Sequence, residues 1–281
     1  MRKEIEVTKE HDLLSLISGI AYCTVPAWYG CSNVNLKMDM ILPKDRQGCR
    51  RPVILWLCGG GFSVVDRGVW MPELMYFARR GFTIVSAEYR TVKDQPFPAQ
   101  LEDVKSCIRF LKAHAQTFGI DPDRIFVSGE SAGGALAGLA AVYAGDRSFD
   151  VGDYLAYSSD IAGAVTYYGI FNAEKEQEAL EAGSDEGWMK AFVGEWTPEA
   201  VCRASAVEHV TPDVCPMLLL HGGKDGLVPP DQSEEFYQKL TEQGVSCDLI
   251  FVKGAEHGDP VFYQSEVKEL VYEWLRKQAG I

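Results

Sequence analysis

Continuous apolar runs alternate along this chain with segments of helical periodicity, and this alternation limits the possible fold more than any other feature. Uninterrupted apolar runs are typical of strands buried on both faces of a sheet, and they occupy residues 53–58, 82–87, 125–128, 161–168 and 217–221, with a further strand near 248–252. Helical patterns cover intervening segments at about 69–80, 98–111, 132–144, 231–243 and 262–278. Residues 33–42 instead alternate apolar and polar, which predicts a half-buried antiparallel strand.

This order of elements predicts an α/β fold with a mostly parallel sheet and helices on both faces. Ligands of such sheets bind at the carboxyl ends of the strands, so functional residues are expected directly after strands. With 281 residues and no linker-like seam, we expect a single domain over residues 1–281. Residues 172–206, rich in Glu, Ala and Gly, interrupt the alternation and predict a small helical insertion.

Charge and composition narrow the class of partner. The chain has 27 Lys and Arg against 40 Asp and Glu, a net charge of −13 that repels nucleic acid and anionic membranes, so we expect neither as a partner. The apolar run at 13–20 is too short for a membrane span and wrongly flanked for a signal peptide, so we expect a cytoplasmic location. Eight cysteines without a CxxC pair predict no disulfide framework and no zinc or other metal site, although Cys23 and Cys31 could pair in an exported protein.

One motif indicates chemistry. Residues 129–133 read Gly-Glu-Ser-Ala-Gly, which fits G-x-S-x-G, and they lie between a short apolar strand and an Ala-rich helix. A serine on such a tight strand-to-helix turn projects clear of the sheet, and its strained backbone needs small neighbours. Glycine and alanine flank Ser131 on both sides. Ser131 is therefore the candidate nucleophile.

A serine hydroxyl becomes a good nucleophile when an imidazole takes its proton and a carboxylate orients that imidazole. Asp225 lies on a Gly-rich turn after the apolar strand that ends at His221, and His257 lies on the loop after the last strand. The resulting order, serine then aspartate then histidine, is the one expected for a nucleophile on a G-x-S-x-G turn. Asp225 and His257 are therefore the candidate orienting acid and base.

The other histidines and the nearby carboxylates are weaker candidates. His221 precedes the acidic turn, so we expect it to fix the loop that holds Asp225. Glu256 and Asp259 lie too near His257 in the sequence to reach across its imidazole. The remaining histidines are expected at the surface or in packing positions, and they are His11, His114 and His209.

Negative charge that develops on a carbonyl oxygen must be met by fixed N–H donors. The amide of Ala132, directly after the nucleophile, is one expected donor. The segment Cys-Gly-Gly-Gly-Phe at 58–62 follows a buried strand, and we expect Gly60 and Gly61 to supply the second. Phosphate binding by this loop is disfavoured because the chain is acidic and contains neither GxGxxG nor GKS/T.

From about residue 34 to residue 274 the chain resembles the α/β-hydrolase-fold serine esterases, near the branch of bifunctional acetylxylan and feruloyl esterases and related short-chain carboxylesterases. The matching motifs lie at 57–62, 87–90, 97–105, 119–125, 129–134, the Asp225 turn and His257-Gly258. These enzymes usually carry a histidine before the three glycines that braces the loop, and Cys58 stands there instead. We expect the oxyanion donors to survive and the hydrogen bonding of the loop to change, since a nucleophilic Cys58 would need a base of its own.

The resemblance implies hydrolysis of short-chain carboxylic esters through an acyl-enzyme, without a cofactor. It also implies small-molecule ester substrates, namely acetyl or feruloyl esters of plant-derived sugars. An arylformamidase or another small-molecule amide hydrolase would use the same machinery, and a non-catalytic receptor on this scaffold is a more distant alternative. The sequence carries no signal for the oligomeric state. Candidate pocket residues, for which core packing is the alternative, are Phe62, Trp70, Trp188 and Trp196.

Overall fold

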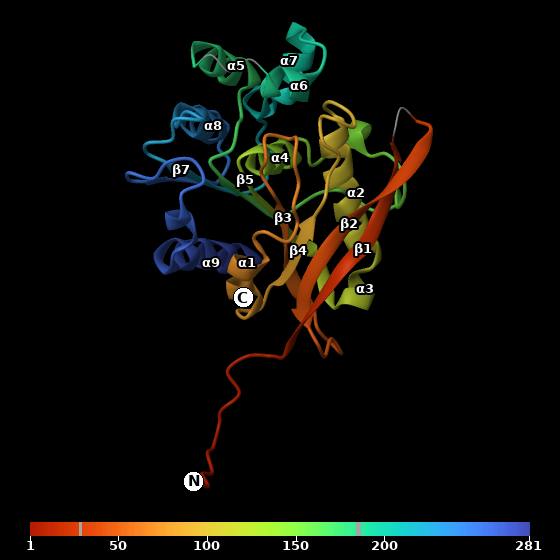
Figure 1. The fold of residues 1–281 in the computed structure, drawn as a ribbon, viewed down its shortest axis with the longest axis vertical. Coiled ribbons are helices and arrows are strands. Elements are labelled where there is room, and N and C mark those ends of the chain that lie inside the picture. The colour runs from red at the N-terminus through yellow and green to blue at the C-terminus, as the bar shows by residue number, and fades with distance from the viewer. Residues whose placement is uncertain (28–29, 184–186) are drawn as a thin grey trace.

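One eight-stranded sheet forms the centre of the computed structural model, which describes residues 1–27, 30–183 and 187–281 (Figure 1). The strands are β1 (Leu14–Ala27), β2 (Ser32–Pro43), β3 (Arg51–Leu57), β4 (Thr83–Ala87), β5 (Ile120–Glu130), β6 (Gly163–Tyr167), β7 (Met217–Gly222) and β8 (Cys247–Val252). They lie in the order β1-β2-β4-β3-β5-β6-β7-β8. The β1–β2 and β2–β4 pairs are antiparallel, and all other pairs are parallel.

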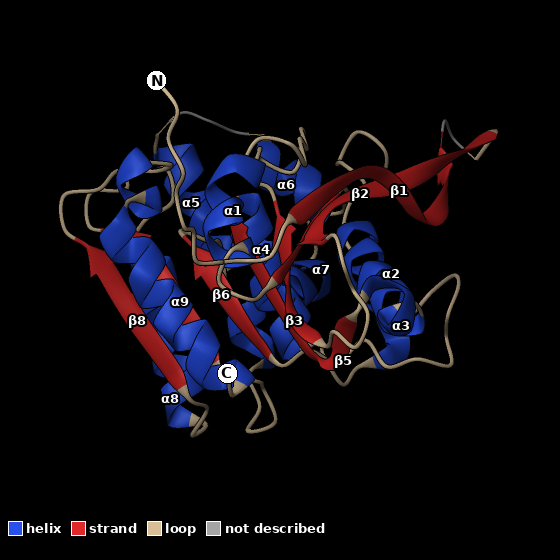
Figure 2. Cartoon of the chain, turned by 90° about the horizontal axis from the view of Figure 1, so that it is seen from below, coloured by secondary structure: helices blue, strands red, loops and turns tan. Residues whose placement is uncertain are grey.

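Helices cover both faces of this sheet (Figure 2). One face carries α2 (Ala99–Ala113), α4 (Ala132–Val142) and α8 (Asp231–Glu242), with the single turn α3 (Ala115–Phe118) after α2, and the other carries α1 (Met71–Ala78) and α9 (Ser265–Ala279). Successive side chains of β3 confirm the two faces, because Leu55 packs in the first cluster whereas Ile54 and Trp56 pack in the second. The predicted α/β architecture, with a mostly parallel sheet between two helical layers, is confirmed.

Three further helices lie within the segment where a helical insertion is predicted, and they are α5 (Ala173–Ala182), α6 (Trp188–Val193) and α7 (Pro198–Ala204). Figure 1 shows them grouped at one end of the molecule, opposite the end from which the N-terminal segment extends. Side chains from all three helices belong to the same hydrophobic cluster as α2 and α4. Short 3₁₀ helices complete the described elements, and they are η1 (Arg147–Phe149), η2 (Ala206–His209) and η3 (Pro260–Tyr263).

Strand β1 is not predicted from the sequence. This edge strand is half exposed, and its register with β2 shifts between Ile17 and Ile20 and again between Ala21 and Cys23. Each shift interrupts the two-residue alternation by which a strand is recognised in a sequence. The prediction near 125–128 is also too short, because β5 begins at Ile120.

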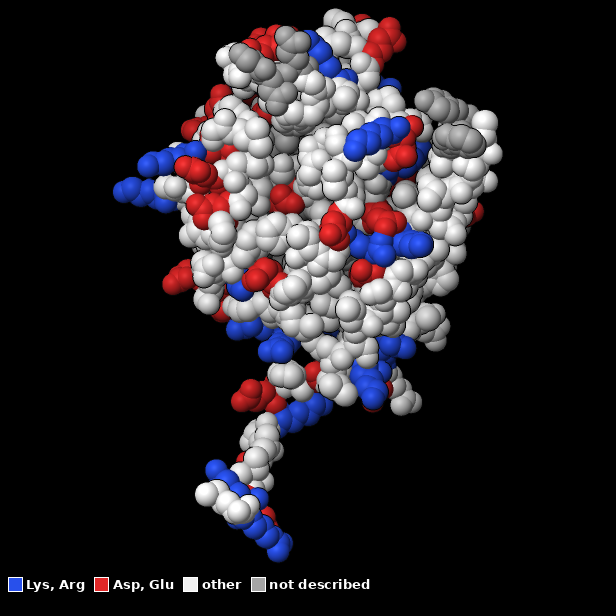
Figure 3. Space-filling view, in the orientation of Figure 1, with Lys and Arg blue, Asp and Glu red and all other residues white. Residues whose placement is uncertain are grey.

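Surface charge and helix length are relevant to the prediction that neither nucleic acid nor a membrane is a partner. On the face drawn in Figure 3, acidic and basic side chains are interspersed over the body of the molecule, so charge on this face is distributed rather than gathered in one patch. Within the described ranges, no helix has the length and apolar character needed to cross a bilayer.

Candidate active site

Three loops at the carboxyl edge of the sheet bring Ser131, Asp225 and His257 together. The loops follow β5, β7 and β8. Nε2 of His257 lies 2.9 Å from Oγ of Ser131, and Nδ1 of the same ring lies 2.7 Å from Oδ2 of Asp225. His257 lies 126 positions from Ser131 and 32 positions from Asp225 in the chain, yet the three side chains form one continuous hydrogen-bonded series.

Ser131 occupies a strained backbone conformation at the start of α4. Its φ of 55° and ψ of −121° are rarely adopted by residues other than glycine. Two backbone hydrogen bonds hold it there, because its N–H donates to the carbonyl of Tyr167 at 2.9 Å and its carbonyl accepts from Ala135 at 2.9 Å. The turn predicted from the G-x-S-x-G motif is present, and it directs the hydroxyl towards His257.

The buried carboxyl group of Asp225 is hydrogen bonded at both oxygens. Oδ1 accepts the N–H groups of Leu227 at 3.0 Å and Val228 at 2.9 Å, and Oδ2 faces His257 and His221. Burial raises the pKa of Asp225, but hydrogen bonds from the two histidines and from Val228 outweigh burial and hold the pKa well below its usual range. Asp225 is therefore an ionised acceptor beside the His257 ring.

His221 holds the loop that carries Asp225. The ring is fully buried, with Nε2 3.0 Å from the carbonyl of Val228 and Nδ1 2.6 Å from Oγ of Ser233 on α8. A carbonyl can only accept, so these partners assign the proton to Nε2 and make Nδ1 the acceptor of the Ser233 hydroxyl. With both nitrogens engaged, His221 supports Asp225 and leaves His257 as the imidazole that reaches Ser131.

The glycine loop, residues 59–61, leaves the sheet next to the turn that carries Ser131. Leu57, the last residue of β3, is paired with Gly129 of β5, so the segments that follow the two strands lie side by side. In the part of the chain that the structure describes, the N–H groups of Gly60, Gly61 and Ala132 donate to no protein acceptor. These N–H groups remain available to an anion beside the Ser131 hydroxyl.

Cys58 precedes this loop, and its side chain bonds to the segment that follows the glycines. Its thiol is buried and donates to the carbonyl of Asp66 at 3.0 Å. Burial raises the pKa of Cys58 to about 12, so the thiol is neutral at physiological pH and a poor nucleophile. The N–H of Gly59, the first loop residue, donates instead to the carboxylate of Glu130.

Phe62 and Trp188 lie where the glycine loop meets the insertion. Phe62 is fully buried, with a φ of 57°, and its ring stacks on Phe192 of α6 at a centroid distance of 3.8 Å. The Trp188 ring lies 6.1 Å from that of Phe62. The insertion therefore packs directly on the residue after the candidate oxyanion donors, and a substrate-binding role for these two side chains stays a prediction.

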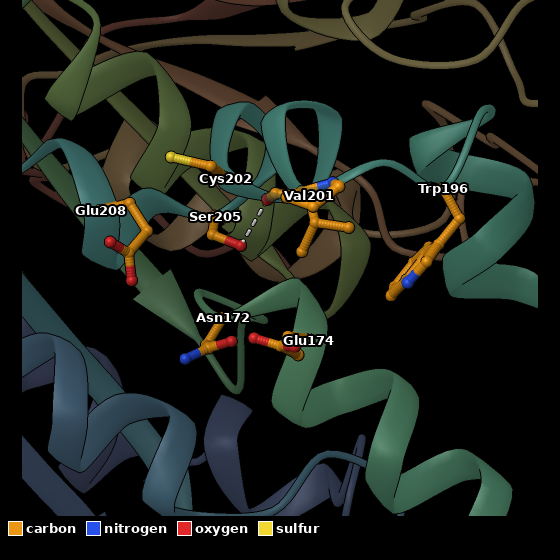
Figure 4. Close-up of a pocket in the computed structure, with 8 residues that line it drawn as sticks. Asn172, Glu174, Trp196, Val201, Cys202, Ser205 and Glu208 are labelled. Carbon is orange, nitrogen blue, oxygen red and sulfur yellow. Dashed lines mark hydrogen bonds between the residues drawn. The ribbon is translucent and has the colours of Figure 1, made fainter.

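Trp70 and Trp196 have different surroundings. Trp70 stacks on Tyr263 at 4.1 Å and donates its Nε1–H to Glu130 at 3.2 Å. Trp196 is 37% exposed and lines a cavity of about 350 Å³ in the insertion, with its indole directed into the opening (Figure 4). This cavity contains none of Ser131, Asp225 and His257, and it is lined by Asn172, Glu174, Trp196, Pro198, Val201, Cys202, Ser205 and Glu208. Pocket roles for both tryptophans stay predictions.

Two residues beside the candidate site are not identified by the sequence analysis. Glu130 contacts the glycine loop, and the Tyr168 ring lies 4.8 Å from the ring of His257. The only sequence signal for Glu130 is its place inside the G-x-S-x-G motif. Tyr168 directly follows β6, and the rule that functional residues follow parallel strands could have indicated it.

Comparison with known proteins identifies the family. The model of the BD-FAE family matches residues 38–240. The chain belongs to the BD-FAE family. Several carboxylic ester hydrolases and esterase structures match it, and together with the observed sheet they confirm the α/β-hydrolase fold expected from the resemblance.

Individual similarities agree with this family. The probable carboxylic ester hydrolase LipM of Mycobacterium tuberculosis is 30% identical over 195 residues, which cover 68% of this chain and 45% of LipM. Esterase 2 of Thermogutta terrifontis, phosphoramylated by tabun, has a TM-score of 0.78 and 26% identity over 93% of this chain and 94% of that one. An acetyl ester-xyloside bifunctional hydrolase from Caldicellulosiruptor lactoaceticus shares the fold, with a TM-score of 0.76 and 24% identity over 92% of this chain and 96% of that one. The chain spans about half the length of the curated relatives it matches.

Proposed function

We propose that the protein hydrolyses carboxylic esters through an acyl-enzyme formed on Ser131. The observation that carries this proposal is the hydrogen-bonded series from Ser131 through His257 to Asp225, at 2.9 and 2.7 Å. These distances lie within the range needed for direct proton transfer between nucleophile and base. The esterases among the matched proteins support the same reaction class.

Acylation begins when the Ser131 hydroxyl attacks the ester carbonyl carbon and transfers its proton to Nε2 of His257. The carboxylate of Asp225 stabilises the imidazolium that forms, and the N–H groups of Gly60, Gly61 and Ala132 receive the negative oxygen of the tetrahedral intermediate. His257 then gives its proton to the departing alcohol oxygen. An acyl group remains on Ser131.

Deacylation repeats these steps with water. His257 removes a proton from water, the resulting hydroxide attacks the acyl carbon, and the second tetrahedral intermediate occupies the same N–H donors. Collapse of this intermediate returns the proton to Ser131 and releases the carboxylic acid. Each proton has a donor and an acceptor among the triad, the substrate and water, so the proposed cycle needs no cofactor.

We further propose that the substrates are acetyl or feruloyl esters of plant-derived sugars, as the sequence resemblance implies. Membership of the BD-FAE family supports this class. Small amides such as a formamide are the alternative, because the same triad attacks either carbonyl. The size and lining of the pocket discriminate between the two, so the proposal is tested with substrates rather than with triad variants alone.

The test is a substrate panel with Ser131→Ala as the control. Acetyl, butyryl and octanoyl aryl esters, acetylated xylo-oligosaccharide, methyl ferulate and N-formylkynurenine are assayed for turnover, and labelling by a fluorophosphonate is followed by mass spectrometry. We expect turnover of the acetyl and sugar esters, labelling at Ser131, and loss of both in Ser131→Ala. Retained ester hydrolysis in Ser131→Ala would contradict the mechanism. Turnover of the formamide alone would leave the mechanism and refute the substrate class.

A further inference from the structure

Glu130 is a buried carboxyl group that the proposed hydrolysis does not use. It ends β5, directly before Ser131, and is only 9% exposed. Its Oε1 accepts the backbone N–H of Gly59 and, at 3.2 Å, the Nε1–H of Trp70. A Cβ atom placed on Gly59 would lie 2.5 Å from Oε2, so the carboxyl group fills the space that glycine leaves open. Glu130 is therefore packed against the base of the glycine loop.

We infer that Glu130 is a positioning residue, which holds the glycine loop against the turn that carries Ser131. This inference rests on the proposed function. Gly59 directly precedes Gly60 and Gly61, and Ser131 directly follows Glu130. One carboxyl group thus connects the two segments whose separation determines how far the oxyanion donors lie from the attacking oxygen.

The side chain of Cys58 bonds to the segment after the glycines, whereas the N–H of Gly59 is held by Glu130. A histidine is expected at position 58 from the resemblance, where it would brace the loop. The Cys58 thiol instead donates to the carbonyl of Asp66 at 3.0 Å. The backbone carbonyl of Cys58 accepts from the hydroxyl of Tyr89 at 2.5 Å. Among the described residues, Glu130 supplies the side-chain acceptor that the Gly59 N–H requires. The loop is therefore anchored to the nucleophile turn itself.

Burial affects the titration of Glu130 and of the groups near it. The other titratable groups that face Glu130 are Cys58, Tyr89, Tyr168 and Tyr263. Burial raises the pKa of Cys58 to about 12 and raises those of the three tyrosines well above their usual range, so these groups stay neutral at physiological pH. Burial also raises the pKa of Glu130, and hydrogen bonds from Gly59 and Trp70 oppose this rise.

Two variants separate the hydrogen bonds from the charge. Glu130→Gln keeps an oxygen that accepts from Gly59 and Trp70 but removes the charge. We expect its kcat on a short acyl ester to change little, because the amide oxygen still accepts the hydrogen bonds that hold the glycine loop. Glu130→Ala removes charge and acceptor together. Its kcat is expected to fall about 10- to 100-fold with a smaller change in KM, because the oxyanion donors lose their fixed position.

The matched control is Glu256→Ala. This exposed glutamate directly precedes His257 in the sequence, so the variant removes the same kind of side chain near the base but no hydrogen bond to the glycine loop, and its kcat is expected to stay near that of the wild type. Thermal unfolding is recorded for each variant. The inference is overturned if Glu130→Gln loses as much kcat as Glu130→Ala, or if the activity of Glu130→Ala falls only in proportion to the loss of folded protein.

The outcome is distinguishable from a failure of the proposed function. Ser131→Ala is measured on the same ester in the same assay. If Ser131→Ala retains activity, the proposed mechanism fails whatever the Glu130 variants do. If Ser131→Ala is inactive while both Glu130 variants behave as wild type, the proposed function stands and the role of Glu130 is refuted.

Discussion

Asp225 controls the orientation of the His257 ring. Its Oδ2 accepts from Nδ1 of His257, while the backbone N–H groups of Leu227 and Val228 hold Oδ1 in place. Asp225→Asn would place an amide N–H₂ group at one of these positions and favour the wrong tautomer of His257. We expect kcat to fall by about 10³- to 10⁴-fold with little change in KM, as measured by steady-state ester hydrolysis.

Asp259→Asn is the matched control for Asp225→Asn. Asp259 also flanks His257 in the sequence, but its Oδ1 accepts the N–H of Val261 at 3.0 Å and caps η3. Its kcat is therefore expected to remain near that of the wild type. Similar losses in the two variants would contradict the assignment of Asp225 as the orienting acid.

Prediction of single residues from the sequence succeeds where a motif and chain order are sufficient. The glycines around Ser131 indicate a tight turn, and the strand ends before Asp225 and His257 place both at the carboxyl edge of the sheet. Glu130 is different, because its importance depends on a contact with Gly59, 71 positions earlier, and on its burial. Neither property is encoded in the residues next to it.

The glycine loop provides a prediction for a whole segment. At Gly60, φ is 125° and an added Cβ would collide with the carbonyl oxygen of Val64, whereas at Gly61, φ is 56° and an added Cβ would meet nothing within 4 Å. Gly60→Ala must therefore displace the loop, and we expect its kcat to fall about 100-fold. In Gly61→Ala only the left-handed backbone conformation is unfavourable, by about 1 to 2 kcal/mol, so this variant is expected to lose less activity.

The two loop variants are compared by kcat on one short acyl ester and by melting temperature. A larger loss in Gly61→Ala than in Gly60→Ala would contradict the role of the collision with Val64. Equal melting temperatures would place the effect in the loop rather than in global stability.

The contact between α5 and α8 contains another buried carboxyl group. Glu176 of α5 is fully buried, its Oε2 accepts from Nε2 of Gln232 at 3.3 Å, and its Oε1 has no hydrogen-bond partner among the described residues. Burial, with Asp225 and Asp231 nearby, raises the pKa of Glu176 from 4.5 to about 8. The folded protein thus retains a proton that the unfolded chain releases above about pH 4.5, and stability is lost progressively as pH rises from there to about 8.

Glu176→Gln supplies a neutral side chain at every pH. We expect a gain in the free energy of unfolding that grows with pH and reaches about 1 to 3 kcal/mol near pH 8. Urea unfolding at pH 5.5 and 8.5 measures the gain, with the exposed Glu174→Gln on the same helix as the control. A gain that does not depend on pH, or an equal one in Glu174→Gln, would refute this origin.

Elements are predicted from the sequence where their periodicity is regular. Amphipathic α2 and the apolar run of β3 satisfy simple patterns, and both are found within a few residues of the predicted bounds. The half-exposed edge strand β1 escapes prediction, because its register shifts break the pattern and pairing with β2 stabilises it.

At the scale of the whole molecule, the insertion and the sheet share one hydrophobic cluster. Leu180, Phe192 and Val201 of the insertion belong to the same cluster as Leu55 and Val127 of the central strands. We therefore propose that the chain behaves as one domain and unfolds in a single transition. Calorimetric and van't Hoff enthalpies should agree, and far-UV circular dichroism should coincide with tryptophan fluorescence. An earlier, separate fluorescence transition would contradict a single cooperative unit.

Periodicity and chain order alone do not predict the order of the strands in the sheet. Alternation of strands and helices gives the α/β class, and the handedness of crossovers limits the possible topologies. It does not specify that β3 lies between β4 and β5, which is the arrangement that brings the glycine loop beside Ser131. The position of β3 between β4 and β5 depends on helices packing on both faces of the sheet.

Periodicity, turn residues and the G-x-S-x-G motif are set by neighbours in the chain, so the sequence is enough to predict the elements, the nucleophile turn and the order of Ser131, Asp225 and His257. The hydrogen bond from Gly59 to Glu130 and the low pKa of Asp225 arise only in the folded molecule. Both depend on partners brought together from distant positions and on the exclusion of water around them. Desolvation and long-range hydrogen bonding have no local pattern, and therefore only the assembled sheet and its covering helices reveal them.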